Sequence, residues 1–419
     1  MSELLNRRLN FFNKMKENSV AILFAGVSKV SSEDEFLPFC INKNFYYFTN
    51  IKQENSVLVF VKGLVNKSIY LFIDEYSALK ERWTGKRLTN DQAKLISEIN
   101  NIYSRNQLNT ILDLALAKEN NQYGAIDTIY IDLAPELKID SLKSTQHFAD
   151  EIIGKYPHIS IADAYPMVRD LRMVKSSYEI EEIAKAISDT NAGIITVLNS
   201  MKPGAFEYEL ADVFEFYGRK KYQTTLSFNT IVAAGKNATC MHYPTQTDVI
   251  RENQLVLFDL GYRRDEYCAD ISRTYPVSGT FQGKQRDIYE AVLNTNKAVI
   301  EFIREGMTLK EINEFTKKFL KNECLRLNLM TEDEDISTYY MHNVSHHLGL
   351  DTHDISLRDR PLENGNVITV EPGLYFDKYE IGVRIEDDVA ILNGRAELLS
   401  KGVKKEIIDI ERLLRTKGI

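Results

Sequence analysis

Apolar and polar positions in the first part of the chain form short β-rich runs separated by stretches with a helical pattern. The helical stretches are expected near Asn90–Ile99 and Gln107–Ala117, where the apolar spacing differs from the alternation of a strand. This mixture predicts an α/β domain. Its strands are expected at Val20–Phe24, Ser56–Lys62, Ile69–Ile73 and Ile129–Asp132.

A change of pattern near Asp170–Lys175 marks the expected domain boundary. Ser176 and Glu179 form a Ser-x-x-Glu capping box, which predicts a helix running toward Asn199. Pro203-Gly204 then breaks the chain before another helix expected from Phe206. A further helix is indicated by apolar residues that share one face at 3.6-residue spacing: Ile288, Val292, Thr295, Val299 and Phe302. We therefore expect two domains, residues 1–174 and 175–419, with an uncertainty of about four residues at the boundary.

Two acidic residues lie in the strands expected at Leu255–Tyr262 and Tyr267–Val277. Asp259 and Asp270 are equally far from the Arg264-Asp265 midpoint of the connecting link. A tight hairpin would place them directly opposite each other, with Cβ atoms roughly 4.5–5.5 Å apart. Like charges so placed repel, and therefore the arrangement predicts a cation between them.

Two glutamates add to this acidic set. Glu371 directly follows the β-rich run Val367–Val370, which Pro372-Gly373 terminates. Glu386 lies in the strand expected at Ile381–Ile391 and shares one face of it with Arg384. Buried acids are costly unless a cation pairs with them, and so the cluster is the place to look for function.

Histidines complete the candidate metal site. Five of the seven histidines lie in two short motifs: His242, His342, His346, His347 and His353. His342 and His346 have the His-x-x-x-His spacing of a zinc helix, but no Glu follows His342 and the neighbouring Leu-Gly-Leu indicates a loop. We expect His346 to join Asp259, Asp270, Glu371 and Glu386 as a metal ligand.

An oxygen-rich ligand set with one imidazole favours hard or borderline divalent ions. Manganese is the first choice, with cobalt, zinc and iron as alternatives. Two such ions, roughly 3.5–4 Å apart, would activate a bridging hydroxide near neutral pH. The sequence therefore predicts a dinuclear hydrolase.

The composition of the chain limits which partners and which cellular compartment are expected. The chain has 419 residues, 44% hydrophobic and 27% charged, with a formal net charge of −8. The absence of a basic stripe argues against nucleic acid and anionic membranes. The four cysteines lack Cys-x-x-Cys spacing, and the apolar run Val20–Gly26 is too short for a signal peptide or a membrane span. A cytoplasmic protein is expected.

The chain resembles the aminopeptidase P and prolidase family of metallopeptidases, which shares the pita-bread catalytic fold with methionine aminopeptidase. The five acidic and histidine ligands in order, with eleven residues from Asp259 to Asp270, carry the resemblance. It extends over nearly the whole chain through further segments: Asp34–Phe39, Asn44–Thr49, Trp83–Arg87, Leu171–Ser176, Phe228–Ala233 and Met241–Tyr243. The resemblance implies an N-terminal α/β domain followed by a pita-bread domain with a curved antiparallel sheet and flanking helices.

The resemblance also implies roles that spacing alone does not assign. His242 and His353 would bind substrate and stabilise the tetrahedral intermediate. His342, Tyr375 and Arg384 would surround a proline ring. Glu371 would bind metal and also move a proton to the leaving nitrogen.

Two positions and one segment depart from the family pattern, and the role of a further residue stays open. His347 stands where a bulky aromatic residue is common, and Asn343 where glycine is common. The segment between Glu371 and Glu386 is shorter than in many relatives, which affects the pocket wall. Trp83, the one tryptophan, could reach a neighbouring subunit's site, although packing within its own domain is the favoured reading.

The predicted activity is that of a Xaa-Pro aminopeptidase, which removes the residue before a penultimate proline. The nearest alternative is a prolidase, which cleaves Xaa-Pro dipeptides; Arg384 could serve either enzyme. Creatinase shares the fold without the metals and is disfavoured by the intact ligand set. A non-catalytic peptide-binding pita-bread module is the alternative from another class. The resemblance further implies a homodimer or homotetramer.

Overall fold

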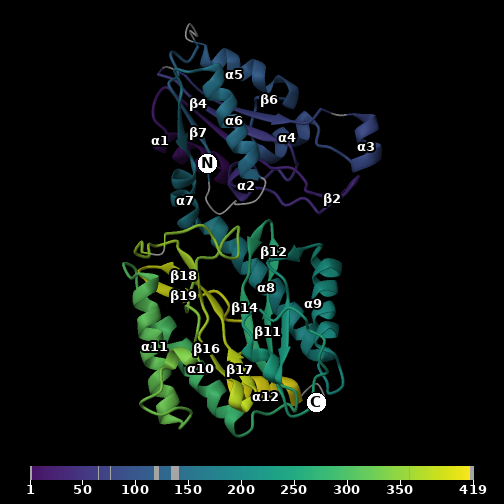
Figure 1. Cartoon of the computed structure of the whole chain (residues 1–419), viewed down its shortest axis with the longest axis vertical. Helices are drawn as coiled ribbons and strands as arrows, with labels where there is room; N and C mark the ends of the chain where they lie inside the picture. Colours follow the sequence, from purple (N-terminus) through teal and green to yellow (C-terminus); the bar gives the residue numbers. More distant parts are fainter. Residues whose placement is uncertain are drawn as a thin grey trace. The chain divides into compact units, whose positions relative to one another are not determined.

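The computed structural model describes residues 2–64, 66–75, 77–117, 122–133, 141–357 and 359–415. It divides into two compact units, Met1–Arg172 and Met173–Ile419, and each has a buried core of its own. In Figure 1 the first unit runs from purple to blue and the second from teal to yellow. The mixed α/β class expected from the sequence is confirmed.

The N-terminal unit is built on a six-stranded sheet in the order β6-β5-β4-β1-β7-β8. β4 lies antiparallel to both β1 and β5, whereas the pairs β1–β7, β7–β8 and β5–β6 are parallel. The four strands predicted from the sequence are confirmed, and the two that were missed are short, partly exposed edge strands. The bounds are β1 Ser19–Phe24, β4 Val57–Lys62, β5 Lys67–Ile73, β6 Ile102–Ser104, β7 Thr128–Ile131 and β8 Ser160–Asp163.

Both faces of this sheet are covered by helices. α5 and α6 pack on one face through Leu112, Leu116 and Ile152, and Phe11 of α1 packs against Phe60 on the other face. The predicted α4 and α5 are confirmed, and α4 begins at a capping box formed by Thr89 and Gln92. The other elements are α1 Glu3–Lys14, β2 Val30–Ser32, β3 Glu35–Phe36, α2 Lys43–Thr49, α3 Ala78–Thr84, α4 Asn90–Ser97, η1 Arg105–Gln107, α5 Leu108–Leu116, α6 Ser141–Lys155 and α7 Tyr165–Met173.

Trp83 lies on the short helix α3 and is 79% exposed. The favoured expectation that it packs inside its own domain is therefore wrong for a single chain. Trp83, Phe36 and Phe39 line a cavity of about 690 Å³ in the N-terminal unit. Leu37 and Leu79 are exposed as well, so this unit presents an apolar surface.

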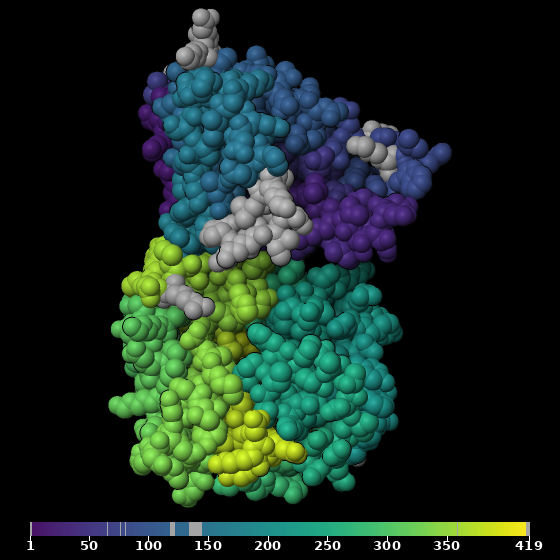
Figure 2. Space-filling model, viewed as in Figure 1, coloured from purple at the N-terminus to yellow at the C-terminus, as the bar shows by residue number. Residues whose placement is uncertain are grey.

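Two helix pairs flank the strands of the second unit: α8 packs on α9, and α10 packs on α11 (Figure 1). The three predicted helices are confirmed as α8 Ser177–Ser200, α9 Glu207–Tyr222 and α10 Lys284–Phe302. The Ser176–Glu179 capping box opens α8 as predicted. The remaining helices are α11 Leu309–Arg326 and α12 Ile407–Arg415, the latter visible in yellow at the surface in Figure 2.

The strands of the second unit pair only antiparallel within the described residues, as a pita-bread domain requires. They form the groups β10-β11-β14, β13-β12-β9, β15-β18-β19 and β16-β17. The bounds are β9 Thr225–Leu226, β10 Ile231–Ala234, η2 Gly235–Thr239, β11 Leu255–Leu260, β12 Tyr262–Arg264, β13 Tyr267–Cys268, β14 Ile271–Pro276, η3 Ile336–Thr338, β15 Val367–Val370, β16 Gly373–Phe376, η4 Asp377–Tyr379, β17 Ile381–Arg384, β18 Asp387–Leu392 and β19 Arg395–Leu398. The predicted pita-bread fold is confirmed.

The predicted register of the metal-site hairpin is wrong by two residues. Asp259 pairs with Ser272 rather than with Asp270. The turn is centred on Asp265-Glu266, with φ of 42° and 69°, and not on Arg264-Asp265. Positive φ at both central residues gives the turn a twist that matches the flanking strands, which dipeptide preference did not reveal. Because a slip of two preserves the side-chain face, Asp270 stays on the side of the sheet that bears Asp259.

Three strands predicted as continuous are each divided in two. The Leu255–Tyr262 strand breaks at Gly261, the Tyr267–Val277 strand at Ala269-Asp270, and the Ile381–Ile391 strand at Ile385-Glu386. The last break has a clear cause, since β17 pairs with β16 whereas β18 pairs with β15. At this break the backbone bonds outside these two ladders, since the Glu386 N–H donates to the Ser272 carbonyl at 3.0 Å.

No helix among the described residues is long and apolar enough to cross a lipid bilayer. The four cysteines are free thiols, with Cys40 and Cys240 exposed and Cys268 and Cys324 buried.

Candidate active site

The five predicted metal ligands lie near the ends of strands in the second unit. Asp259 is the penultimate residue of β11, and Asp270 immediately precedes β14. Glu371 lies between β15 and β16, and Glu386 between β17 and β18. His346 belongs to the loop before β15, so the loop expected from the sequence, and not a zinc helix, carries it. Carboxylates at strand ends can turn away from the ladder toward a shared space.

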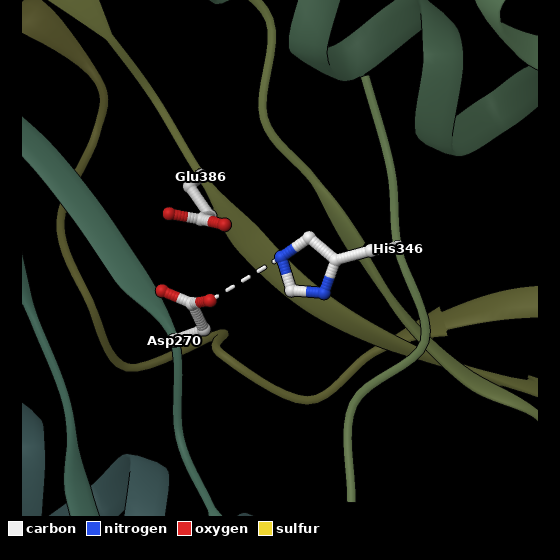
Figure 3. Close-up of side chains that lie close together, drawn as sticks. All are labelled: Asp270, His346 and Glu386. Atoms are coloured by element: carbon white, nitrogen blue, oxygen red, sulfur yellow. Dashed lines mark ion pairs between the residues drawn. The ribbon is translucent and has the colours of Figure 1, made fainter. Parts of the chain in front are cut away.

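Asp270, His346 and Glu386 form a compact group, with one ligand atom from each within 4.8 Å of the others. Figure 3 shows the three side chains turned toward one another. His346 Nε2 lies 3.4 Å from Asp270 Oδ2 and 3.6 Å from Glu371 Oε1. The structure therefore brings four of the five predicted ligands together, with the acids Asp270, Glu371 and Glu386 around the His346 imidazole.

Asp259 lies outside that compact group. Its Oδ2 accepts a hydrogen bond from Arg384 Nη2 at 2.6 Å. Its Oδ1 is buried and has no hydrogen-bond partner in the described part of the chain. Its charge nevertheless acts on Asp270 and Glu386, so Asp259 borders the same space.

The pKa values of the acids show that the cluster lacks counter-charge. Burial, together with Asp259, Asp388 and Glu371, raises the pKa of Asp270 well above its ordinary value. Burial and the neighbouring acids likewise raise the pKa of Glu386 well above its usual range. Burial also raises the pKa of Glu371, against the lowering effect of His346 and Arg384. Like charges held together without enough counter-charge produce this pattern.

These residues fit divalent metal ions. The orphaned Asp259 Oδ1 and the neighbouring carboxylates supply the oxygen donors that such ions prefer. His346 Nδ1 lies 3.0 Å from the backbone oxygen of His347. Because a carbonyl only accepts, this contact places the proton on Nδ1 and leaves the Nε2 lone pair directed at the acids.

Three predicted substrate-binding residues form one hydrogen-bonded group. Tyr375 Oη lies 2.8 Å from His342 Nε2 and accepts from Arg384 Nη1 at 3.1 Å. His342 Nδ1 lies 2.8 Å from the Asn343 backbone oxygen, which places the proton on Nδ1, so the Tyr375 hydroxyl donates to His342 Nε2. Burial and the Arg384 charge lower the pKa of His342 to about 4. Neutral His342 lies beside Glu371, with 3.7 Å between Nδ1 and Oε2.

The two predicted oxyanion histidines come from different loops. The His353 ring packs edge-on against the His346 ring, with centroids 4.3 Å apart. His242 is exposed, and its charge contributes to the lowered pKa of His342. Both histidines therefore border the acid cluster, and their catalytic roles stay predictions.

Two residues of the site were missed by the sequence reasoning. Ser272 Oγ donates to Glu386 Oε2 at 2.7 Å and accepts from Arg384 Nε at 2.7 Å. Asp388 Oδ2 accepts from the Asp270 backbone N–H at 3.1 Å. Each lies two residues beyond a predicted ligand, and same-face alternation along a strand could have indicated both.

The departures from the family pattern leave the cluster intact. His347 is buried, 1% exposed, and its side chain does not take the place of His346 beside the acids. Burial, helped by the charge of Lys175, lowers the pKa of His347 to about 3. Asn343 accepts a hydrogen bond from Asn313 at 3.2 Å. As expected, neither residue removes a ligand.

The fold and this acid–histidine site define a metal-dependent exopeptidase, and the chain belongs to metallopeptidase family M24, whose profile matches residues 181–393. Residues 5–123 match the aminopeptidase P N-terminal domain.

Particular relatives share almost the whole length of the chain. The Xaa-Pro aminopeptidase of Haemophilus influenzae is 32% identical over 98% of this chain and 97% of its own. A solved structure of a Bacillus anthracis protein assigned to aminopeptidase P is 39% identical, with a TM-score of 0.94 over 99% of this chain and 98% of that one. Zinc-substituted Escherichia coli aminopeptidase P, in complex with product, has a TM-score of 0.89 and 28% identity over 100% of this chain and 99% of its own.

Proposed function

We propose that this chain removes the N-terminal residue from peptides whose second residue is proline. The observation that carries the proposal is the His342–Tyr375–Arg384 group, which lies beside Glu371 at the edge of the metal cluster. A prolyl bond has no N–H, so its recognition depends on ring shape and on the carbonyl oxygen. The Haemophilus relative and the match to the aminopeptidase P N-terminal domain support the same activity.

We assign Asp259, Asp270, His346, Glu371 and Glu386 as ligands of two divalent ions. Manganese is our first choice, with cobalt, zinc and iron as alternatives; the Escherichia coli structure contains zinc. When bound, such ions polarise a carbonyl and lower the pKa of water.

The chain's own residues supply orientation and proton transfer. We assign to Glu371 the transfer of a proton from water to the leaving proline nitrogen, because its carboxylate lies beside both His346 and His342. We assign to His242 and His353 the donation of hydrogen bonds to the developing oxyanion or the adjacent carbonyl.

Arg384 bears on the length of the substrate. Its Nε, Nη1 and Nη2 already donate to Ser272, Tyr375 and Asp259. A guanidinium with each nitrogen engaged is suited to holding the pocket walls rather than to capturing a free proline carboxylate. This observation favours an aminopeptidase over a prolidase.

The first experiment compares Arg-Pro-Pro with Ala-Pro as substrates of chelator-stripped enzyme, with and without added manganese. Metal-dependent release of arginine from the tripeptide supports the proposal. Cleavage of the dipeptide alone would make the enzyme a prolidase. If neither peptide is cut with metal demonstrably bound, the proline pocket is wrongly assigned.

We also propose that residues 1–174 form a non-catalytic domain, that residues 175–419 form the catalytic domain, and that the chain assembles into a homodimer or homotetramer in the cytoplasm. Self-association through the N-terminal unit is supported by its exposed apolar side chains, of which Trp83 and Phe36 line one cavity, because large exposed apolar patches often mark protein interfaces. Sedimentation velocity of the wild type and of Trp83→Ala tests the assembly. Cell fractionation tests the compartment.

A further inference from the structure

Glu207, at the start of α9, is a fully buried carboxylate outside the proposed metal cluster. Its side chain is 0% exposed and accepts four hydrogen bonds, each from a different donor. No cation is among these donors. Moving a buried acceptor away from several donors would leave those donors unsatisfied, at a cost in free energy. The carboxylate therefore holds its four donors in a fixed arrangement.

The two oxygens of Glu207 hold different parts of the unit. Oε1 accepts from the backbone N–H of Ala234 at 2.7 Å and from Asn237 Nδ2 at 3.0 Å. Oε2 accepts from the Tyr243 hydroxyl at 2.9 Å and from the backbone N–H of Asp248 at 3.2 Å. One oxygen is therefore tied to the end of β10 and the η2 turn, and the other to the loop that follows them.

That loop carries His242 between Met241 and Tyr243. In the described part of the chain, no backbone N–H of residues 241–245 donates to another backbone group. The loop is held through side chains instead: Met241 and Tyr243 pack against a small apolar cluster that contains Tyr375. Asn237 Nδ2 also lies 3.0 Å from the Tyr243 hydroxyl. The position of His242 therefore depends on how Tyr243 is anchored.

The anchored loop faces the substrate side of the site. Tyr375, which packs in the same apolar cluster, is hydrogen-bonded to His342. The charge of His242 acts on His342, so the two histidines border one space. A shift of this loop would move His242 relative to the scissile carbonyl.

We propose that Glu207 is a positioning residue for the reaction, which fixes the His242 loop through the Tyr243 hydroxyl. This inference rests on the proposed function and on the role assigned there to His242. Glu207 does not touch substrate or metal; it acts by holding a donor where the oxyanion develops.

The test uses the full-length, manganese-loaded enzyme with Arg-Pro-Pro and the variants Glu207→Gln, Tyr243→Phe and His242→Ala. Glu207→Gln keeps the shape but turns an amide NH₂ toward two of the four donors. We expect kcat to fall about 10- to 100-fold in Glu207→Gln and about 3- to 10-fold in Tyr243→Phe, because small displacements of catalytic groups are costly. The bound manganese and its dissociation constant are expected to stay unchanged.

Tyr262→Phe is the matched control. Tyr262 is also buried, and its hydroxyl donates to the backbone oxygen of Phe214 on the same helix α9, at 2.5 Å. Among the described residues, the Tyr262 hydroxyl makes no hydrogen bond to the loop that carries His242. We expect its kcat to stay within about twofold of wild type, as for a hydrogen bond that serves stability alone.

A double-mutant cycle separates positioning from general damage. If Glu207 acts through His242, then Glu207→Gln lowers kcat by less than about twofold in the His242→Ala background. An equal fall in both backgrounds would overturn the inference. If Glu207→Gln fails to fold, the same comparison is made with Tyr243→Phe, whose effect on kcat should likewise disappear in the His242→Ala background. Wild-type enzyme that leaves Arg-Pro-Pro uncut contradicts the proposed function itself, before any variant is compared.

Discussion

The two units of this protein bury charge in opposite ways. In the N-terminal unit the notable buried charges are cations that meet backbone carbonyls near helix ends. Arg8 donates to the carbonyls of Phe48 and Ser97, at 3.0 and 2.6 Å. Lys62 donates to the carbonyls of Phe12 and Met15, at 2.7 and 2.6 Å.

These cations serve the structure, because they bond to carbonyl groups near the ends of helices. The last carbonyls of a helix have no partner within the helix, and a cation there satisfies them and interacts favourably with the negative end of the helix dipole. Burial lowers the pKa of Arg8 and of Lys62, but each group already has its acceptors. Nothing in this arrangement calls for a further ligand.

The catalytic unit buries carboxylates that face one another instead. Asp270 and Glu386 have pKa values raised well above ordinary by burial and by neighbouring acids. Asp387, directly beside Glu386, shows the opposite: Arg273 and Lys405, at 2.7 and 2.6 Å, lower its pKa to about 2 despite burial. Charge burial therefore indicates function only where the protein leaves the charge uncompensated.

The sharpest way to break this comparison is to remove Glu371, the uncompensated acid with the proposed proton-transfer role. Glu371→Ala is expected to lower kcat by about 10³-fold or more, since general acid–base catalysis contributes 10²–10⁴-fold and a ligand is lost as well. Arginine release from Arg-Pro-Pro, measured with metal content determined in parallel, checks it. Exposed Glu397→Gln is the control. Turnover by Glu371→Ala at full metal load would contradict the assigned role.

Asp387, the compensated acid, should matter for stability more than for chemistry. Asp387→Asn leaves Arg273 and Lys405 buried without a counter-charge, and we expect a loss of about 3–5 kcal/mol in the free energy of unfolding. Urea unfolding followed by circular dichroism measures it.

The low pKa of Asp387 also sets a pH window for this contribution. A depressed pKa contributes stability that is complete above the unfolded value and is lost as the pH falls from about 4 to about 2. The wild type should therefore lose stability more steeply than Asp387→Asn across that window. If the free energy of unfolding falls equally steeply with pH in both proteins, Asp387 is not the group responsible for the acid-dependent loss of stability.

Metal should supply the counter-charge that the acid cluster lacks. We expect manganese-loaded enzyme to melt about 5–10 °C above the chelated form, since a ligand at a hundred times its dissociation constant adds about 2.7 kcal/mol. Calorimetry of both forms checks this. Glu386→Gln should shrink the difference, whereas Asp387→Asn, which keeps every proposed ligand, should preserve it.

The smallest effect is expected in the N-terminal unit. Arg8→Met leaves the Phe48 and Ser97 carbonyls without their donor, at a cost of about 1–3 kcal/mol. The kcat per folded molecule should be unchanged, because this cation completes structure only. A fall in kcat with normal metal content would show that buried charge in this unit also serves the reaction.

Much of the fold could be predicted from local patterns. The Ser176–Glu179 box and the apolar face of Lys284–Phe302 are read within one helix, where 3.6-residue spacing leaves little ambiguity. The edge strands β6 and β8 were missed because they are short and partly exposed. The hairpin register was misplaced because turn geometry at Asp265-Glu266 is a backbone property that the residue types did not reveal.

In the candidate site, too, local sequence patterns predicted the residue types but not the contacts between segments. The five acidic and histidine ligands stand out because such residues are costly to bury and occur in apolar surroundings. The engagement of Arg384 with Asp259, Ser272 and Tyr375 depends on four segments converging, and no spacing within one segment predicts it. The exposure of Trp83 was likewise missed, since burial depends on what packs against a residue.

By itself, the sequence determined the longer elements, the fold class and the chemical types of the site, because periodicity and the cost of buried charge act within short segments. Only the tertiary structure decided which acid faces which partner. Asp387 meets Arg273 and Lys405, while Asp270 and Glu386 meet other acids and one imidazole. The physical reason is that electrostatic compensation depends on distances of a few ångströms between segments far apart in the chain, and those distances exist only once the strands have paired.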